Sequence, residues 1–130
     1  MKGMQGRIRR QPSSRLRFAG LRSFPRQKMS VEVLVQDSQG WEVPLESLDF
    51  SPTGMFVRSN FLFEVGTIHN LMFRSPEGDE LFAMRAQIVR VADQPGEAQD
   101  KENFVPGMAY EFIETTSESQ QRLKGLAARV

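Results

Sequence analysis

The sequence predicts an all-β fold, an antiparallel barrel or sandwich of six short strands followed by a short helix. Apolar runs with a period of two recur between residues 31 and 113, and turn-forming residues separate them. A helical period does not alternate with these runs and emerges only near residue 116. The chain has 130 residues, of which 39% are apolar, and this is sufficient for one domain with its own core.

Two turns separate the first three predicted strands. The alternating valines of residues 31–35 predict a first strand that ends at the turn Asp-Ser-Gln-Gly of residues 37–40. Residues 41–50 predict a second strand with a disturbed register, and the Ser-Pro-Thr-Gly of residues 51–54 predicts a turn. Residues 55–57 then form a short third strand.

The next three predicted strands are longer. A fourth strand centres on Ile68, Leu71 and Phe73, and a sixth covers residues 108–113, after a polar loop at residues 93–103. The fifth strand covers residues 81–91, and its period of two assigns one set of side chains to the same face. This set is Phe82, Met84, Ala86 and Ile88, and the pattern leaves open whether Arg90 continues it.

The final segment predicts a helix over residues 116–128. Leu123, Leu126 and Ala127 share one side of such a helix, and Ser117 is the expected N-cap. Cations near its end, Lys124 among them, suit the C-terminal end of a helix dipole.

Several classes of function are disfavoured by composition. The chain has no cysteine and a single histidine, His69, so neither a metal site nor a cofactor is expected. Ser51, His69 and Asp49 contain the residue types of a hydrolase triad, but a lone histidine within a strand is expected at a surface or rim position, and we expect no catalysis. The sequence has neither the apolar run of a signal peptide nor that of a membrane span, which predicts a cytoplasmic protein.

The net charge of +1 conceals a strong asymmetry. Residues 1–31 contain nine basic and no acidic side chains, whereas residues 32–130 contain eight basic and sixteen acidic ones. Residues 1–20 also lack apolar periodicity, so we expect a flexible basic arm there and the folded domain over residues 21–130. Such an arm favours an anionic partner: a nucleic acid, an acidic lipid, a phosphorylated ligand, or an acidic protein surface.

Two short clusters contain the chemistry of a binding site. Arg22 and Arg26 lie on one Pro-stiffened linker before the first strand, and a guanidinium group binds the O6/N7 edge of guanine or a phosphate. Asp49, Ser51 and Gly54 lie at the turn between the second and third strands. The carboxylate and hydroxyl can accept hydrogen bonds from the opposite edge of guanine, and a glycine lets backbone approach a ligand closely.

The order and spacing of these clusters resemble the PilZ domain, a bacterial receptor module for cyclic di-GMP. The resemblance covers about residues 21–126, with Arg22 and Arg26 as an RxxxR motif, residues 49–54 as DxSxxG followed by apolar residues, and the late strand that runs into a helix. It implies a six-stranded split barrel with a short C-terminal helix. It further implies cyclic di-GMP bound between the linker and the barrel by Arg22, Arg26, Asp49, Ser51 and Gly54, and an output through altered protein contacts.

The motifs alone leave the ligand stoichiometry and the alternative functions to be considered. Leu21 precedes the first arginine where a basic residue could pair with a second ligand molecule, which favours one ligand per domain. The alternatives are a protein-interaction module or a single-stranded nucleic-acid-binding barrel that uses the basic arm. The acidic excess of residues 32–130 disfavours nucleic acid, because a polyanion is repelled wherever the arm does not reach. The expected output is a repositioned arm that a downstream protein reads.

Overall fold

The computed structural model describes residues 25–93 and 104–130. The predicted arm, together with Leu21 and Arg22, and nearly all of the predicted polar loop lie outside these residues. In chain order the elements are β2 (Gln27–Lys28), β3 (Glu32–Gln36), β4 (Glu42–Ser51), β5 (Gly54–Arg58), β6 (Ile68–Arg74), β7 (Leu81–Ala92), β8 (Gly107–Ile113) and α1 (Ser117–Arg129).

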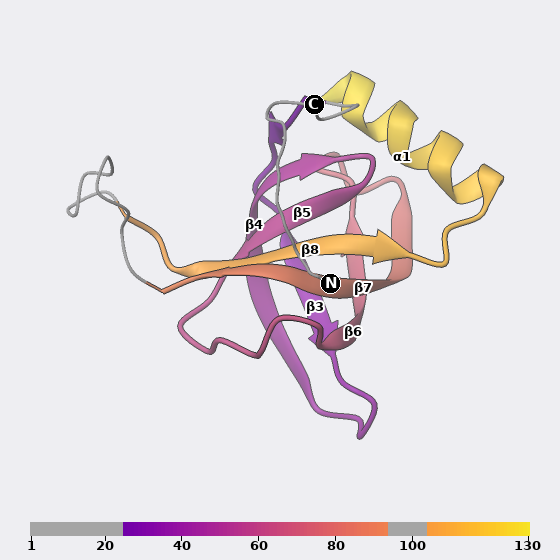
Figure 1. Cartoon of the computed structure of the whole chain (residues 1–130). Helices are drawn as coiled ribbons and strands as arrows, with labels where there is room; N and C mark the ends of the chain where they lie inside the picture. The colour runs from indigo at the N-terminus through magenta and orange to yellow at the C-terminus, as the bar shows by residue number, and fades with distance from the viewer. Residues whose placement is uncertain (1–24, 94–103) are drawn as a thin grey trace, which may run out of the picture.

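Six of these strands form a closed antiparallel barrel (Figure 1). Around the barrel the order is β4, β3, β6, β7, β8 and β5, and β5 pairs back onto β4. The short strand β2 adds to β4 beside the barrel and was not predicted. The observed arrangement is therefore the predicted six-stranded barrel rather than a sandwich.

The core lies inside the barrel, and the inward-facing side chains of the long strands form it. In β6 buried and exposed residues alternate without interruption, as a strand with one wet face requires. The largest fully buried side chains are those of Tyr110, Phe50, Phe82, Met55 and Leu71. Burial of such side chains stabilises the fold by about 1.5–3 kcal/mol each, so the closed barrel rests mainly on this apolar interior.

His69 belongs to this core, and its predicted surface or rim position is wrong. Its side chain is 2% exposed because it alternates inward with Leu71 along β6, while Ile68 points outward. The Tyr110 hydroxyl lies 2.7 Å from His69 Nδ1, and the Phe63 ring packs edge-on against the imidazole. Burial lowers the pKa of His69, partly offset by Asp37, and raises the pKa of Tyr110.

The fifth predicted strand contains an irregularity that the period of two could not reveal. Ile88 pairs with Tyr110 and Arg90 pairs with Ala109, so Val89 is an extra residue in β7. The inward set therefore stops at Ile88, and Arg90 does not continue it. Arg90 is exposed, and Val91 packs against the core instead.

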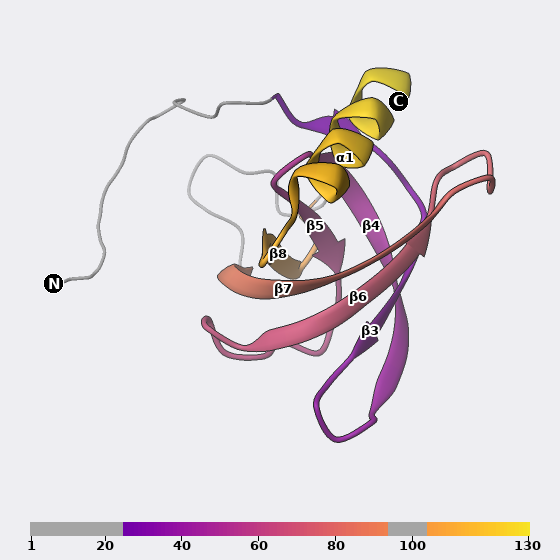
Figure 2. The same ribbon diagram turned by 90° about the vertical axis from the view of Figure 1, so that its right-hand side faces the viewer.

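Helix α1 lies over one end of the barrel (Figures 1 and 2). Leu123 and Leu126 are fully buried in the core, as predicted. The helix covers Ser117–Arg129, close to the predicted 116–128, and its N-cap is Thr116 rather than Ser117, because Thr116 and Ser119 cap each other's backbone N–H groups. Among the described residues, no helix combines the length and apolar composition that crossing a membrane requires.

Ion pairs connect helix α1 to the turn between β6 and β7. Arg122 donates from Nε to Glu80 Oε2 at 2.8 Å and from Nη2 to the Leu81 carbonyl at 2.7 Å. Arg129 donates to the other oxygen of Glu80, and the two arginines together lower the pKa of that carboxyl. The helix is thus attached to the barrel by buried leucine side chains and by ion pairs between its arginines and Glu80.

Candidate ligand-binding site

The predicted arginine linker joins the barrel through strand β2. Gln27 and Lys28 pair with Phe50 and Asp49 near the end of β4. Met29 follows with its side chain buried, and its N–H donates to the Leu48 carbonyl at 3.3 Å. The residues immediately after the RxxxR motif are therefore fixed on the strand that contains the start of the DxSxxG motif.

Ser47 anchors the linker to the barrel. Its buried hydroxyl donates to the Met29 carbonyl at 2.5 Å and accepts from the Val31 N–H at 3.1 Å. The Ser47 N–H in turn donates to the Val31 carbonyl at 2.9 Å. Sequence reasoning did not identify this residue, since a single serine in a strand has no distinguishing pattern.

A bulge in β4 sets the position of Asp49. Ser47 pairs with Val57 and Asp49 pairs with Phe56, so Leu48 is the extra residue that explains the disturbed register predicted here. Asp49 accordingly lies within the strand and not on an exposed turn. Its half-buried side chain is on the outer wall of the barrel, beside the linker.

The two predicted motifs meet at one carboxylate oxygen. Arg26 Nη1 donates to Asp49 Oδ1 at 3.1 Å, and the Phe56 N–H donates to the same oxygen at 3.1 Å. The Arg26 and Asp49 side chains are 25% and 35% exposed, so both remain accessible to a molecule on this wall. Two of the five predicted site residues are thus in direct contact. Arg22, the first arginine of the motif, lies outside the described residues.

Ser51 and Gly54 pair across the tight turn formed by Pro52 and Thr53. The Ser51 side chain is 2% exposed, and its oxygen lies 3.1 Å from Thr53 Oγ1 and accepts from the Thr53 N–H at 3.3 Å. A Cβ on Gly54 would lie 2.1 Å from the Tyr110 carbonyl oxygen of β8. The glycine therefore permits close contact of two strands, which is a structural reason beside the expected one of ligand approach.

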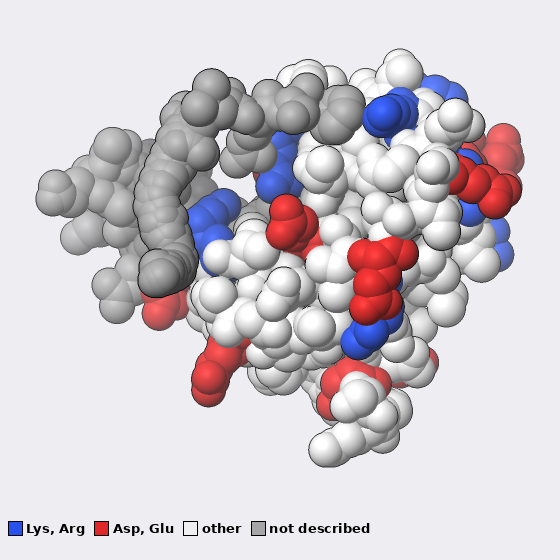
Figure 3. Space-filling view, turned by 45° about the vertical axis from the view of Figure 1, so that its right-hand side comes forward, with Lys and Arg blue, Asp and Glu red and all other residues white. Residues whose placement is uncertain are grey.

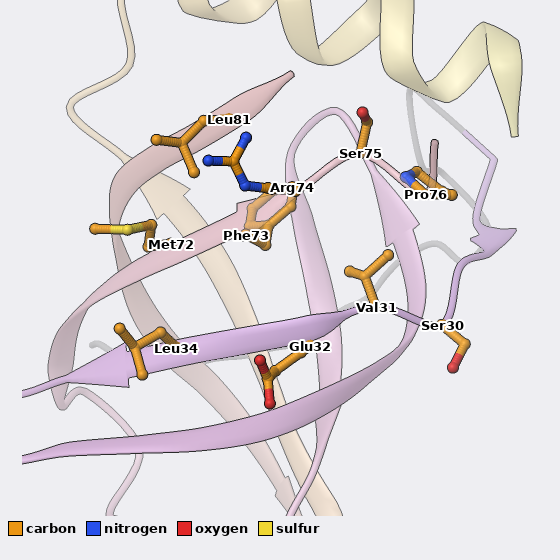
Figure 4. A pocket seen from close by; sticks show the side chains of 10 residues that line it. All are labelled: Ser30, Val31, Glu32, Leu34, Met72, Phe73, Arg74, Ser75, Pro76 and Leu81. Carbon is orange, nitrogen blue, oxygen red and sulfur yellow. The ribbon is translucent and has the colours of Figure 1, made fainter. Parts of the chain in front are cut away.

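A groove of about 490 Å³ lies elsewhere on the barrel, between β3 and β6 (Figure 4). Its lining includes the apolar side chains of Leu34 and Met72 and the charged side chains of Glu32 and Arg74. None of the described residues of the two motifs lines it. Basic and acidic side chains are interspersed on the described part of the face in Figure 3, without a broad basic field that would suit a polyanion.

The fold and this site define a small β-barrel module with a charged linker fixed to its outer wall. The chain belongs to the PilZ domain family, which matches residues 20–129. None of the curated protein sequences matches the chain.

Solved structures share the fold. The inhibitor of motility MotI/DgrA of Bacillus subtilis is 22% identical with a TM-score of 0.65, and the match covers 83% of this chain and 50% of that one. The PilZ domain of YcgR from Escherichia coli with c-di-GMP is 12% identical with a TM-score of 0.66, over 84% of this chain and 90% of that one. A longer YcgR structure in complex with c-di-GMP matches at 12% identity and a TM-score of 0.68, over 84% of this chain and 45% of that one. This chain therefore spans half or less of the two longer proteins.

Proposed function

We propose that this protein is a bacterial, cytoplasmic receptor or adaptor for cyclic di-GMP that acts by binding and performs no catalysis. The observation that supports the proposal best is the contact between Arg26 and Asp49, which joins the RxxxR and DxSxxG motifs at one place on the outer wall. Membership of the PilZ family and the c-di-GMP in the related YcgR structures support the same ligand.

The chemistry of the two motifs suits a guanine-bearing phosphodiester. The guanidinium groups of Arg22 and Arg26 can bind guanine O6 and N7 or a phosphate through paired hydrogen bonds. Asp49 accepts from the N1–H and the exocyclic amine of guanine, and one of its oxygens already accepts two hydrogen bonds, which leaves the other for the base. Ser51 and Gly54 contribute by shaping the turn beside this carboxylate.

The signal in this proposal is a repositioned N-terminal arm that a downstream protein reads. Gln27 and Lys28 are already paired with β4, so the part that changes position precedes them. Limited trypsin digestion tests this output. We expect saturating cyclic di-GMP to slow cleavage after Arg22 but not after Arg7, while cleavage after Lys28 stays slow throughout. Equal digestion at Arg22 with and without ligand contradicts the arm mechanism and leaves binding itself intact.

Isothermal titration calorimetry tests the binding proposal. Cyclic di-GMP should bind, whereas cyclic di-AMP, GTP and a short single-stranded oligonucleotide should bind weakly or not at all. Arg26→Ala should weaken binding by roughly 10- to 100-fold, since it removes a charge-assisted contact. Binding of the oligonucleotide in preference to cyclic di-GMP would support the nucleic-acid alternative instead.

A further inference from the structure

Four residues on neighbouring strands form a row across the outer wall of the barrel. Asp49 of β4 pairs with Phe56 of β5, Phe56 pairs with Ala109 of β8, and Ala109 pairs with Arg90 of β7. Residues directly opposite each other in antiparallel strands point to the same side of the sheet. The row Asp49–Phe56–Ala109–Arg90 therefore continues the candidate site away from the linker, across strands that lie side by side in Figure 1.

Arg90 enters this row because of the bulge in β7. The extra residue Val89 shifts the alternation, so that Arg90 points outward opposite Ala109. Its guanidinium carbon lies 5.8 Å from the centroid of the Phe56 ring, within the range of a cation–π contact.

Four of the other arginines of the barrel and helix lie beside a glutamate, whereas Arg74 of β6 forms no ion pair within the described part of the chain. Arg58, Arg85, Arg122 and Arg129 each form an ion pair with a glutamate. Among residues 25–93 and 104–130, no carboxylate forms an ion pair with Arg90. Within the described part of the chain, the guanidinium of Arg90 thus contacts an aromatic face, and no carboxylate neutralises its charge.

The Phe56 ring makes the middle of the row apolar, and its neighbours there have small side chains or none. A Cβ on Gly107 would lie 2.6 Å from Phe56 Cζ, so the ring extends over β8 at a position without a side chain. Ala109 adds only a methyl group beside it. The ring is half-buried, and a partly exposed aromatic ring next to small residues offers a surface on which a purine can stack.

We infer that Phe56 and Arg90 form a second half of the ligand site, in which the Phe56 ring supports a guanine base and Arg90 binds the phosphate or the O6/N7 edge beside it. The inference rests on the proposed function and extends it. Neighbouring strands are about 4.8 Å apart, so Asp49 and Arg90 are separated by about 14 Å. A ligand with two bases can span that distance, with Arg26 and Asp49 at one end and Arg90 at the other.

Calorimetry with cyclic di-GMP on three variants tests the inference. Arg90→Gln should weaken binding by roughly 10- to 100-fold, and Phe56→Leu by roughly 3- to 10-fold. Arg90→Lys should recover part of the loss, because the charge remains but the paired hydrogen bonds do not. The salt dependence of the affinity should also become shallower in Arg90→Gln, which a merely structural role would not produce.

Arg85→Gln is the matched control. Arg85 is on the outer face of the same strand and is paired with Glu114 at 3.0 Å, so its replacement should leave affinity within about twofold. Wild-type affinity in Arg90→Gln, or an equal loss in Arg85→Gln, would overturn the role of Arg90 while the receptor function stands. No binding of cyclic di-GMP by the wild-type protein would overturn both the proposed function and this inference.

Discussion

Arg26 and Asp49 are 23 residues apart in the sequence, and Arg26 Nη1 donates a hydrogen bond of 3.1 Å to Asp49 Oδ1. The same oxygen accepts the Phe56 N–H, so one carboxylate ties the linker to β4 and β4 to β5. A ligand that contacts both side chains therefore acts on the barrel and the linker together. This coupling gives the proposed signal a physical basis.

Asp49 should influence stability as well as binding. Asp49→Ala leaves the half-buried Phe56 N–H without its acceptor and should lower the free energy of unfolding by about 1–2 kcal/mol. Asp49→Asn keeps an acceptor oxygen and loses only a partly exposed ion pair, so it should lower that free energy by less than about 1 kcal/mol. Both variants should bind cyclic di-GMP more weakly than the wild-type protein. Urea denaturation without ligand distinguishes them, and equal stability of the two variants would contradict the role of the Phe56 contact.

Ser47→Ala should loosen the linker. The change removes the partner of the Met29 carbonyl and of the Val31 N–H at a buried site, so the free energy of unfolding should fall by about 1–3 kcal/mol. Cyclic di-GMP should also bind more weakly, because Arg26 is held in place through this segment. The control Ser38→Ala lies in an exposed turn and should change stability by less than about 0.5 kcal/mol. Unchanged unfolding of Ser47→Ala would show that the anchor contributes nothing.

Gly54→Ala should destabilise the protein even without a ligand. The added Cβ would lie 2.1 Å from the Tyr110 carbonyl, and relief of this overlap requires β5 and β8 to separate, at a cost of about 2 kcal/mol or more. Gly125→Ala should have the opposite sign and stabilise by about 0.5–1 kcal/mol, because Gly125 lies inside α1 and a Cβ there meets no atom closer than 3.7 Å. Thermal unfolding of both variants is the measurement. A stable Gly54→Ala that fails to bind would instead assign the glycine to the ligand alone.

The buried pair of His69 and Tyr110 predicts a pH dependence of stability. Because burial lowers the pKa of His69 in the folded protein, the unfolded chain takes up a proton near its ordinary pKa of 6.5 while the folded protein does not. The free energy of unfolding should therefore fall as pH decreases below about 6.5, by at most about 1.4 kcal/mol per pH unit. His69→Gln should flatten this slope at pH values just below about 6.5. An equally steep slope in that variant would exclude His69 as its source.

The strands could be predicted from the sequence because each has one buried face and one solvent-exposed face, so that apolar and polar residues alternate. Alternation in residues 31–36 and the turns at 37–40 and 51–54 reflect local rules of side-chain direction and backbone turn geometry, and the structure confirms these elements. The Leu123 and Leu126 face of α1 follows from a helical period in the same way. His69 shows the limit of residue type as a guide, because it is buried by the inward alternation of β6 although histidine is usually found nearer the surface.

Local sequence patterns were enough to predict the order of the barrel strands along the chain, the closing helix and the two motifs whose residue types suit a guanine dinucleotide. Three features depend instead on tertiary contacts: β2 pairs with β4, Ser47 anchors the linker, and Arg90 faces outward beside Phe56. Strand pairing and bulges depend on contacts between residues far apart in the chain, and a single extra residue reverses which side of the sheet each later side chain occupies. Local periodicity contains no information about such contacts. The set of side chains on the outer wall of the barrel therefore could not be predicted from the sequence.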